Sequence, residues 1–154
     1  MSSARSSWPL SVAATLGLVL TSGCADDGPD PPFDDATLFA MAADLDGVTS
    51  ARLSYTDTLG TTRMYSGLVE VDATADPRCV LYQTAGLLMQ GRPGAGTPIV
   101  TVVQGTSRTK TADLPFRLWR TLEELAASAT ATPAIPDCSV VDLGIRSPAA
   151  GALP

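Results

Sequence analysis

Residues 45–53, Leu-Asp-Gly-Val-Thr-Ser-Ala-Arg-Leu, contain the change of periodicity that decides the fold. Before this stretch the apolar side chains repeat at helical spacing, at Leu38, Met41, Ala42 and Leu45. After Gly47 apolar and polar residues alternate, as in a strand with one buried face. We therefore predict a helix that begins at Asp34 or Asp35 and ends at Gly47, followed by a strand.

A second alternating stretch, at Tyr65, Gly67, Val69 and Val71, predicts a strand that forms a hairpin with the first, with a turn at Gly60. Asp76-Pro77 is a typical helix start, since aspartate caps the helix and proline fits its first turn. This second helix is expected to end at Gly91. The β-branched run 99–103 predicts a central strand.

A third helix is expected over residues 115–128. Its apolar stripe is predicted to consist of Phe116, Trp119, Leu122 and Leu125. Beyond Cys138, the apolar residues of 140–145 indicate a short edge strand, and residues 147–154 are expected to be a disordered tail.

The order helix, strand, strand, helix, strand, helix predicts an α+β fold: a small open-faced antiparallel sheet with helices on one face. A single domain is expected over residues 35–146, within the usual size of about 100 to 150 residues. The stretch 45–53 is similar to the helix–Gly-Val–strand corner of heavy-metal-associated and other ferredoxin-like domains. This resemblance covers residues 35–104 and implies an open-faced sandwich. The chain lacks that family's first strand and its Cys-x-x-Cys motif, so we expect no metal site.

The N-terminal region has the features of a secretory signal, with Arg5 before an uncharged apolar segment from Trp8 to Leu20. Leu20-Thr21-Ser22-Gly23-Cys24 resembles the lipobox of bacterial lipoproteins, although Thr21 replaces the usual leucine. The resemblance implies that residues 1–23 are removed as a signal peptide and that Cys24 is lipidated, with palmitate among its acyl chains. It also implies a lipid anchor on the extracytoplasmic face of the cell membrane. The alternatives are an ordinary cleaved signal peptide and a hydrophobic helix that stays attached.

The exported, Arg- and Ala-rich chain also looks like small lipoproteins of high-GC actinobacteria. Residues 24–34, rich in Pro and Asp, are predicted to form a disordered tether after the lipidated cysteine. With Cys24 assigned to lipid, Cys79 and Cys138 remain as a pair, and we predict a disulfide between them. It would close a loop of about 60 residues, which the chain-entropy model values at roughly 4 kcal/mol.

Composition excludes several functions. The chain has a net charge of −6, which becomes about −7 without Arg5, and this argues against nucleic acid as a partner. The absence of histidine excludes Ser-His-Asp and Cys-His mechanisms and most zinc sites. Ser107-Arg108-Thr109-Lys110 matches the Ser-x-x-Lys nucleophile motif, but the accompanying motifs are missing, so we expect a polar strand end. Glu123 and Glu124 are neighbours on a helix and are expected to be solvated rather than a catalytic pair.

We therefore expect a protein that is not an enzyme and needs no cofactor. A candidate docking patch lies near Phe116. It is made up of the basic residues Arg108, Lys110, Arg117 and Arg120 together with Trp119. The alternative is that Trp119 belongs to the core and the arginines are merely solvated. The predicted function is that of a membrane-anchored, non-catalytic module that binds an envelope protein or an envelope polymer, through the sheet face or the basic helix. The second possibility is a carrier of a small apolar ligand or lipid at the membrane surface.

Overall fold

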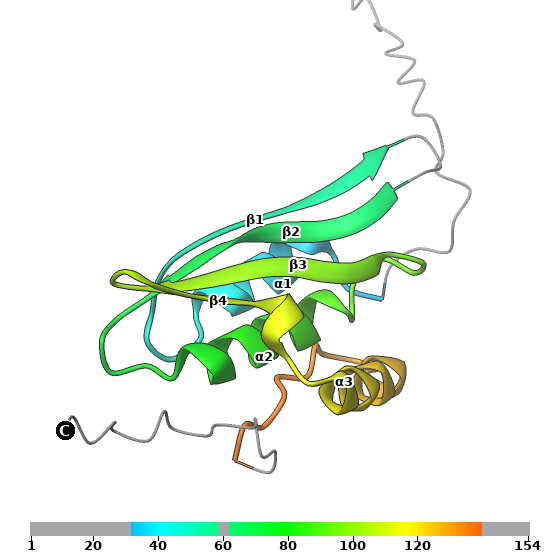
Figure 1. Cartoon of the computed structure of the whole chain (residues 1–154). Helices are drawn as coiled ribbons and strands as arrows, with labels where there is room; N and C mark the ends of the chain where they lie inside the picture. The colour runs from blue at the N-terminus through cyan, green and yellow to red at the C-terminus, as the bar shows by residue number, and fades with distance from the viewer. Residues whose placement is uncertain (1–31, 59–61, 140–154) are drawn as a thin grey trace, which may run out of the picture.

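The computed structural model describes residues 32–58 and 62–139 of the chain (Figure 1). Within these ranges the elements follow the order expected from the sequence, with one additional strand and a short 3₁₀ turn. They are α1 (Asp35–Ala43), β1 (Val48–Thr58), β2 (Thr62–Val71), α2 (Pro77–Leu88), β3 (Gly96–Gln104), β4 (Ser107–Lys110), η1 (Thr111–Asp113) and α3 (Phe116–Ser128).

The four strands form one open sheet in the order β1-β2-β3-β4. β1 pairs with β2, and β3 with β4, in antiparallel hairpins, whereas β2 and β3 run parallel. The sheet is thus mixed rather than wholly antiparallel as expected. The reason is the crossover through α2, which brings the chain back to the end of the sheet where β2 began. The strands of this βαβ unit are neighbours, whereas ferredoxin-like domains have a split unit. The similarity to those domains is therefore limited to the helix–Gly-Val–strand corner at residues 45–53.

Helices α1 and α2 lie on one face of the sheet, which confirms the predicted α+β arrangement (Figure 1). α1 contacts β1, α2 contacts β3, and the two helices contact each other. α3 packs against α2 on the side away from the sheet and so adds an outer layer. The fully buried side chains between sheet and helices include Leu38, Tyr65, Val69, Leu81, Leu88, Val100 and Val102.

The two predicted helix starts are confirmed. The Asp34 carboxylate accepts the Thr37 N–H at 2.8 Å, and the Asp76 carboxylate accepts the Arg78 N–H at 2.9 Å. Gly47 has a φ of 77°, a left-handed conformation that suits glycine, and a Cβ there would also overlap Ala75. The chain can therefore turn from α1 into β1 at the residue where the sequence pattern changes.

The helical stripe predicted for α3 is wrong in part. The buried residues of the helix are Leu118 and Leu122, whereas Phe116 is 87% exposed. Trp119 is half-buried at the margin of the core. Both Phe116 with Trp119 and Leu118 with Leu122 have helical spacing. The leucines, which are smaller than the aromatic residues, face α2 because α2 and α3 approach closely at Gly86, where a Cβ would overlap Leu122.

The structure confirms the Cys79–Cys138 disulfide, with a Cα–Cα separation of 5.6 Å. It fastens residues 133–138, which we call the strap, along α2 (Figure 1). Pro136 of the strap is buried against Gly86, where a Cβ would overlap its ring. The strap contacts Cys79, Gln83 and Gly86, which follow the helical spacing of one face of α2, and Gln90, which lies just beyond the end of the helix.

Several predictions concern residues outside the described ranges. They are the signal peptide 1–23 with the lipidation site Cys24, most of the tether 24–34, the turn at Gly60, the edge strand at 140–145 and the tail 147–154. The predicted C-terminal boundary of the domain, at residue 146, also lies there.

Candidate functional site

The structure divides the predicted docking patch between two surfaces. Arg108 and Lys110 lie in β4, at one edge of the sheet. Arg117, Trp119 and Arg120 lie in α3, in the outer helical layer. The five side chains do not share one surface, so each group is considered by itself.

We call the side of the sheet that faces away from α1 and α2 the open face. Val102 is fully buried on the helix side and pairs with Thr109. Because side chains alternate along a strand, Arg108 and Lys110 point to the open face. The same alternation and the strand register place further side chains on the open face, among them Arg52, Leu68, Glu70, Ile99, Thr101 and Val103. In the part of the chain that the structure describes, no helix lies over this face (Figure 1).

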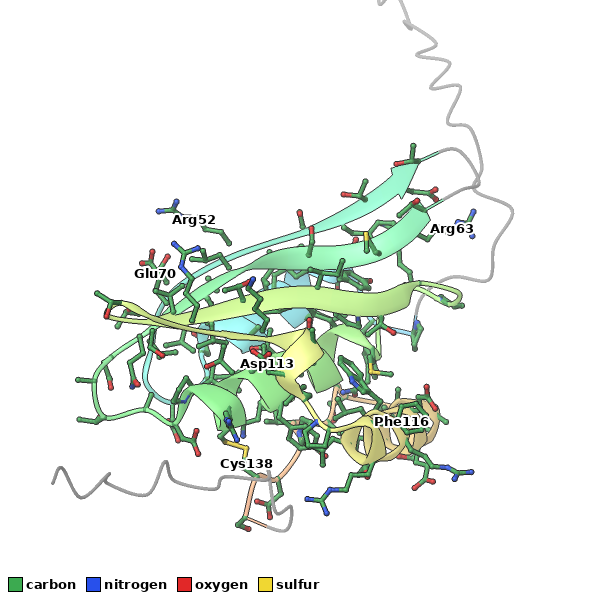
Figure 2. The ribbon with its side chains drawn as sticks, in the orientation of Figure 1. Arg52, Arg63, Glu70, Asp113, Phe116 and Cys138 are labelled. Carbon is green, nitrogen blue, oxygen red and sulfur yellow. A yellow bond between two sulfur atoms is a disulfide. The ribbon has the colours of Figure 1, made fainter. Side chains whose placement is uncertain are left out.

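One row of paired residues crosses the open face from edge to edge. Arg52 pairs with Leu68, Leu68 with Thr101, and Thr101 with Lys110. Neighbouring strands lie about 4.8 Å apart, so the backbone positions of the two cationic residues are about 14 Å apart. Arg52 projects away from the sheet and the helices (Figure 2). The face is therefore basic at both edges, and between them it carries apolar side chains, among them Ile99 at 56% exposed, together with Thr101 and the single acidic residue Glu70.

The open face is positively charged in an acidic chain. It carries Arg52, Arg108 and Lys110 against a single acidic residue, Glu70, whereas the whole chain has 10 basic and 16 acidic residues. Among the described residues, ion pairs join Arg63 to Asp57 and Arg92 to Asp35, and none involves the three cations of this face. Their charges remain available to a ligand.

A polar cluster at one end of the sheet joins α1, β2 and the loop after α2. The Tyr65 hydroxyl donates to Asp35 Oδ1 at 2.7 Å and accepts the Arg92 N–H at 2.9 Å. The Arg92 guanidinium donates to Asp35 Oδ2 through Nε and Nη2, at 3.1 and 3.0 Å. It also lies over the Tyr55 ring, 4.5 Å from the centroid. A Cβ at Gly91 would overlap the Tyr65 hydroxyl, so glycine permits this close approach.

Burial, and next the hydrogen bond to Asp35, raise the pKa of Tyr65 well above its ordinary value of 10.0. The pKa of Arg92 is raised by its hydrogen bond to Asp35. Both shifts keep these groups in the protonation states in which they bond to one another. A hollow of about 260 Å³ lies beside the cluster, lined mainly by the loop 91–97. We assign the cluster a structural role, because the polar atoms described in it are committed to one another.

The outer side of α3 forms a third surface. Phe116, Trp119, Arg120 and Glu123 line a hollow of about 360 Å³. These positions are three, four and seven residues from Phe116, so they form one stripe opposite Leu118 and Leu122. Figure 2 places Phe116 at the start of the helix, on the outer layer of the molecule. This surface combines an exposed aromatic ring with both signs of charge.

The Ser107–Lys110 motif gains no catalytic geometry from the structure. Both residues lie in β4, and residues three apart in a strand point to opposite faces. Ser107 therefore lies on the helix side and Lys110 on the open face. The hydroxyl and the amine of the motif cannot meet over one substrate, as a nucleophile and its base must.

Residues 32–58 and 62–139 contain no group of three His, Cys, Asp or Glu side chains that could hold a metal ion. No helix in the same ranges has the length and apolar character needed to span a membrane.

Sequence reasoning missed two features of these surfaces. It did not connect Arg52 to Arg108 and Lys110, because they are more than 50 residues apart and only the strand register aligns them. It also missed the bonds of Arg92 to Asp35 and Tyr65, which are 57 and 27 residues away. The alternation of residues would have placed Arg52 on the outward face of its strand. It could not have shown that Arg108 and Lys110 lie on the same face.

Comparison with protein-family models, with curated proteins and with solved structures finds no significant match to this chain.

Proposed function

We propose that this chain is an exported, lipid-anchored protein of the bacterial cell envelope, and that its folded domain is a non-catalytic module. In this proposal, residues 1–23 are a signal peptide and Cys24 carries the lipid. The domain binds an acidic envelope protein through the open face. The observation that carries the binding part is the row of residues from Arg52 to Lys110, with cations at both edges of an uncovered sheet.

The charge of the open face indicates the chemistry of its partner. Complementary charges steer association and suppress wrong partners. A matching surface has acidic groups about 14 Å apart, because three spacings of about 4.8 Å separate the two edge strands. Between these acidic groups it has an apolar area that contacts Leu68 and Ile99. A second copy of the open face does not fit, because its own three cations would lie against those of the first.

A protein fits the open face better than a polysaccharide does. None of the residues that the strand register places on this face is aromatic, although aromatic rings are what sugars usually stack on. The exposed Ile99 and the half-buried Leu68 and Val103 supply apolar contact instead. The centre of a protein interface is typically poor in charge and surrounded by a polar rim, and the three cations of the open face lie at its two edges with apolar side chains and a single carboxylate, Glu70, between them.

The alternative function, a carrier of a small apolar ligand or lipid, needs a cavity. The space between the sheet and the helices holds closely packed buried side chains such as Tyr65, Leu81 and Val100. The two hollows described above lie at a loop and on the outer side of α3. Native mass spectrometry of the purified chain would favour the carrier if an apolar molecule stayed bound to it.

The test is site-specific crosslinking of the full chain in bacterial membranes. A photoreactive amino acid replaces Ile99, and the matched control carries it at Asp44, an exposed position beyond α1. We expect position 99 to capture one acidic envelope protein, identified by mass spectrometry. The reversal of charge in Arg108→Glu with Lys110→Glu should abolish this capture.

Two results would contradict the proposal. One is capture that survives the charge reversal, because the cations would then contribute nothing. The other is capture of the same protein from position 44, because the open face would then not be the binding surface.

A further inference from the structure

The stretch of chain that leads into α1 carries three carboxylates. Residues 26–30, which we call the acidic segment, read Asp-Asp-Gly-Pro-Asp and lie just before the described residues, which begin at Pro32. Its three negative charges equal in number the three positive charges of the open face, which belong to Arg52, Arg108 and Lys110. The acidic segment and the open face are therefore complementary in charge.

The spacing of the charges matches as well. The first and last aspartates of the acidic segment, Asp26 and Asp30, are four residues apart. An extended, proline-containing chain rises about 3.1 Å per residue, so these two residues are about 12 Å apart. The cations at the two ends of the row on the open face, Arg52 and Lys110, have backbone positions about 14 Å apart. The difference is smaller than the length of either basic side chain.

The uncharged middle of the acidic segment matches the middle of the row. Gly28-Pro29 lies between the aspartates, and Leu68 and Thr101 lie between the cations. No charge is thus placed against an apolar side chain, where it would lose water without gaining a partner. Glu70, the acidic residue that the strand register places on this face, belongs to the neighbouring row, two positions further along β2. A segment that follows the first row does not lie over it.

The place where the described chain begins brings the acidic segment within reach of the open face. The Tyr65 hydroxyl is bonded to Asp35, and Tyr65 pairs with Tyr55 of β1. Arg52 lies three residues further along β1, a distance of about 10 Å. The five residues from Asp35 to Asp30 span up to about 17 Å, and the two charged side chains extend this reach. Because α1 packs against β1, and β1 is an edge strand, the path leads around this edge.

We propose that the acidic segment docks on the open face, along the row from Arg52 to Lys110, and so covers the binding surface of its own chain. Asp30 faces Arg52, and the two aspartates at the other end face the two cations of β4. An acidic partner protein then has to displace the acidic segment, which acts as a competitive inhibitor within the chain. The competition rests on the proposed function, whereas the docking does not.

The docking gains from the short connection between the acidic segment and the domain. Ion pairs at a surface are individually weak in water. A segment joined to its site by a few residues, however, has a local concentration on the order of millimolar, so a weak contact is still populated. A partner that adds apolar contact at the exposed Ile99 can displace it.

The first test is photocrosslinking within the purified full chain. A photoreactive amino acid replaces Ile99, which lies on the open face two residues from Thr101 of the row. We expect an adduct within one chain, mapped by mass spectrometry to residues 26–30. The matched control carries the photoreactive amino acid at Asp44. This residue follows the nine-residue α1, about 14 Å from its start, and is within similar reach but off the open face.

The expected yield of this adduct is at least fivefold higher from position 99 than from position 44. Equal yields would mean that the acidic segment does not prefer the open face, and would overturn the docking. Adducts from position 99 that join two copies of the chain, or that contain only lipid or another protein, would overturn it too.

The second test changes the charges. Asp30→Arg places like charges together at Arg52 and should lower the yield of the internal adduct about fivefold. Arg52→Asp in the same chain restores opposite charges and should recover the adduct. Salt at 1 M should also lower the yield from the original chain, because the screening length falls from about 10 Å at 0.1 M to about 3 Å. A yield that does not recover, or that salt leaves unchanged, would refute the docking.

A second pair of substitutions tests the other end of the row. Asp26→Lys should lower the adduct yield, and Lys110→Glu in the same chain should restore it. Circular dichroism verifies that the variants fold, as expected because Arg52 and Lys110 are exposed. The two pairs are independent, so one of them still decides the result if a variant of the other does not fold.

The third test measures competition in bacterial membranes. Replacement of the three aspartates of the acidic segment by asparagine should raise the capture of the acidic envelope protein from position 99 about threefold to tenfold. Such a rise corresponds to an open face covered in about 70 to 90% of the chains, since a covered face lowers the apparent affinity by that fraction. The matched control, Asp44→Asn with Asp46→Asn and Glu124→Gln, makes the same change of net charge at exposed positions elsewhere.

An equal rise in the control, or no rise in the variant of the acidic segment, would refute the inhibition. If neither chain captures a protein from position 99, the proposed function fails and the inhibition with it. The internal adduct of the purified chain still decides whether the acidic segment docks, so the two failures give different results.

Discussion

Gln90 and Ala134 exchange two hydrogen bonds across 44 residues of chain. Gln90 Nε2 donates to the Ala134 carbonyl at 2.7 Å, and the Ala134 N–H donates to Gln90 Oε1 at 2.6 Å. Gln90 is 2% exposed, and the same Nε2 also donates to the Gly86 carbonyl at 2.8 Å. A single amide side chain thus pairs with the strap backbone much as a neighbouring strand would.

The first prediction concerns this amide. Gln90→Leu should lower the free energy of unfolding by about 2 to 4 kcal/mol, because it leaves polar groups of the strap backbone buried without partners. Urea denaturation followed by circular dichroism measures the change. Gln83→Leu, which removes one half-buried bond to Pro136, is the matched control and should cost about 1 kcal/mol. Equal effects of the two variants would contradict the prediction.

The second prediction concerns the disulfide. Replacing Cys79 and Cys138 together by serine should lower the free energy of unfolding by about 4 kcal/mol, through the entropy of the unlinked unfolded chain. Thermal denaturation of the two proteins under non-reducing conditions is the measurement. Peptide mapping of the wild-type chain should recover the two cysteines joined. Recovery of both as free thiols would refute the pairing.

The third prediction is a pH dependence. The pKa of Tyr65 is raised in the folded state, chiefly by burial and then by its bond to Asp35. The folded protein therefore holds the phenolic proton more tightly than the unfolded chain does. This contribution to stability is complete below pH 10, and it is lost as the pH rises through the folded-state pKa.

Tyrosinate absorbance measures this effect. The chain has three tyrosines, and we expect Tyr65 to ionise above pH 10, together with unfolding. Tyr82, whose pKa burial also raises, is a second contributor to the same loss. In Tyr65→Phe the tyrosinate signal that accompanies unfolding should be smaller. An unchanged titration curve would show that Tyr65 ionises freely in the folded protein.

The fourth prediction is a gain of stability. Thr84 lies in α2, is 0% exposed, and has a hydroxyl without a hydrogen-bond partner among the described residues. Thr84→Val replaces the hydroxyl by a methyl group of similar size and removes an unpaired buried polar atom. The free energy of unfolding should rise by about 1 kcal/mol. Thr121→Val, at an exposed position of α3, is the control with no expected gain.

The fifth prediction tests the anchor. Metabolic labelling with a palmitate analogue should modify the full chain, and Cys24→Ser should abolish the label and release the protein from membranes. Cys79→Ala is the control, because Cys79 is held in the disulfide and should not affect labelling. Label that persists in Cys24→Ser would exclude the lipidation site.

The helix starts and the first hairpin could be predicted from the sequence because their signals are local. Asp34 and Asp76 cap helices within three residues of themselves, and β1 and β2 alternate clearly. β4 was not predicted as a strand, because Ser-Arg-Thr-Lys carries no apolar alternation. It forms because Gly105, with a φ of 59°, turns the chain back onto β3.

The candidate surfaces were harder to predict because they depend on which elements meet. Helical spacing allows both Phe116 with Trp119 and Leu118 with Leu122 to face inward, and only the approach of α2 at Gly86 decides between them. The docking patch was placed by proximity in the sequence. The turn from β4 into α3 in fact separates Arg108 and Lys110 from Arg117 and Arg120.

The bonds of Asp35 to Tyr65 and Arg92 also have a mechanical consequence. The described part of the chain begins beside this cluster: Phe33 is buried, Asp34 caps α1, and Asp35 is bonded to β2 and to the loop after α2. A pulling force applied through the preceding residues, as by an anchor in a moving membrane, would be transmitted first to the sheet. The first turn of α1 would then resist unwinding until the bonds to Tyr65 and Arg92 had ruptured.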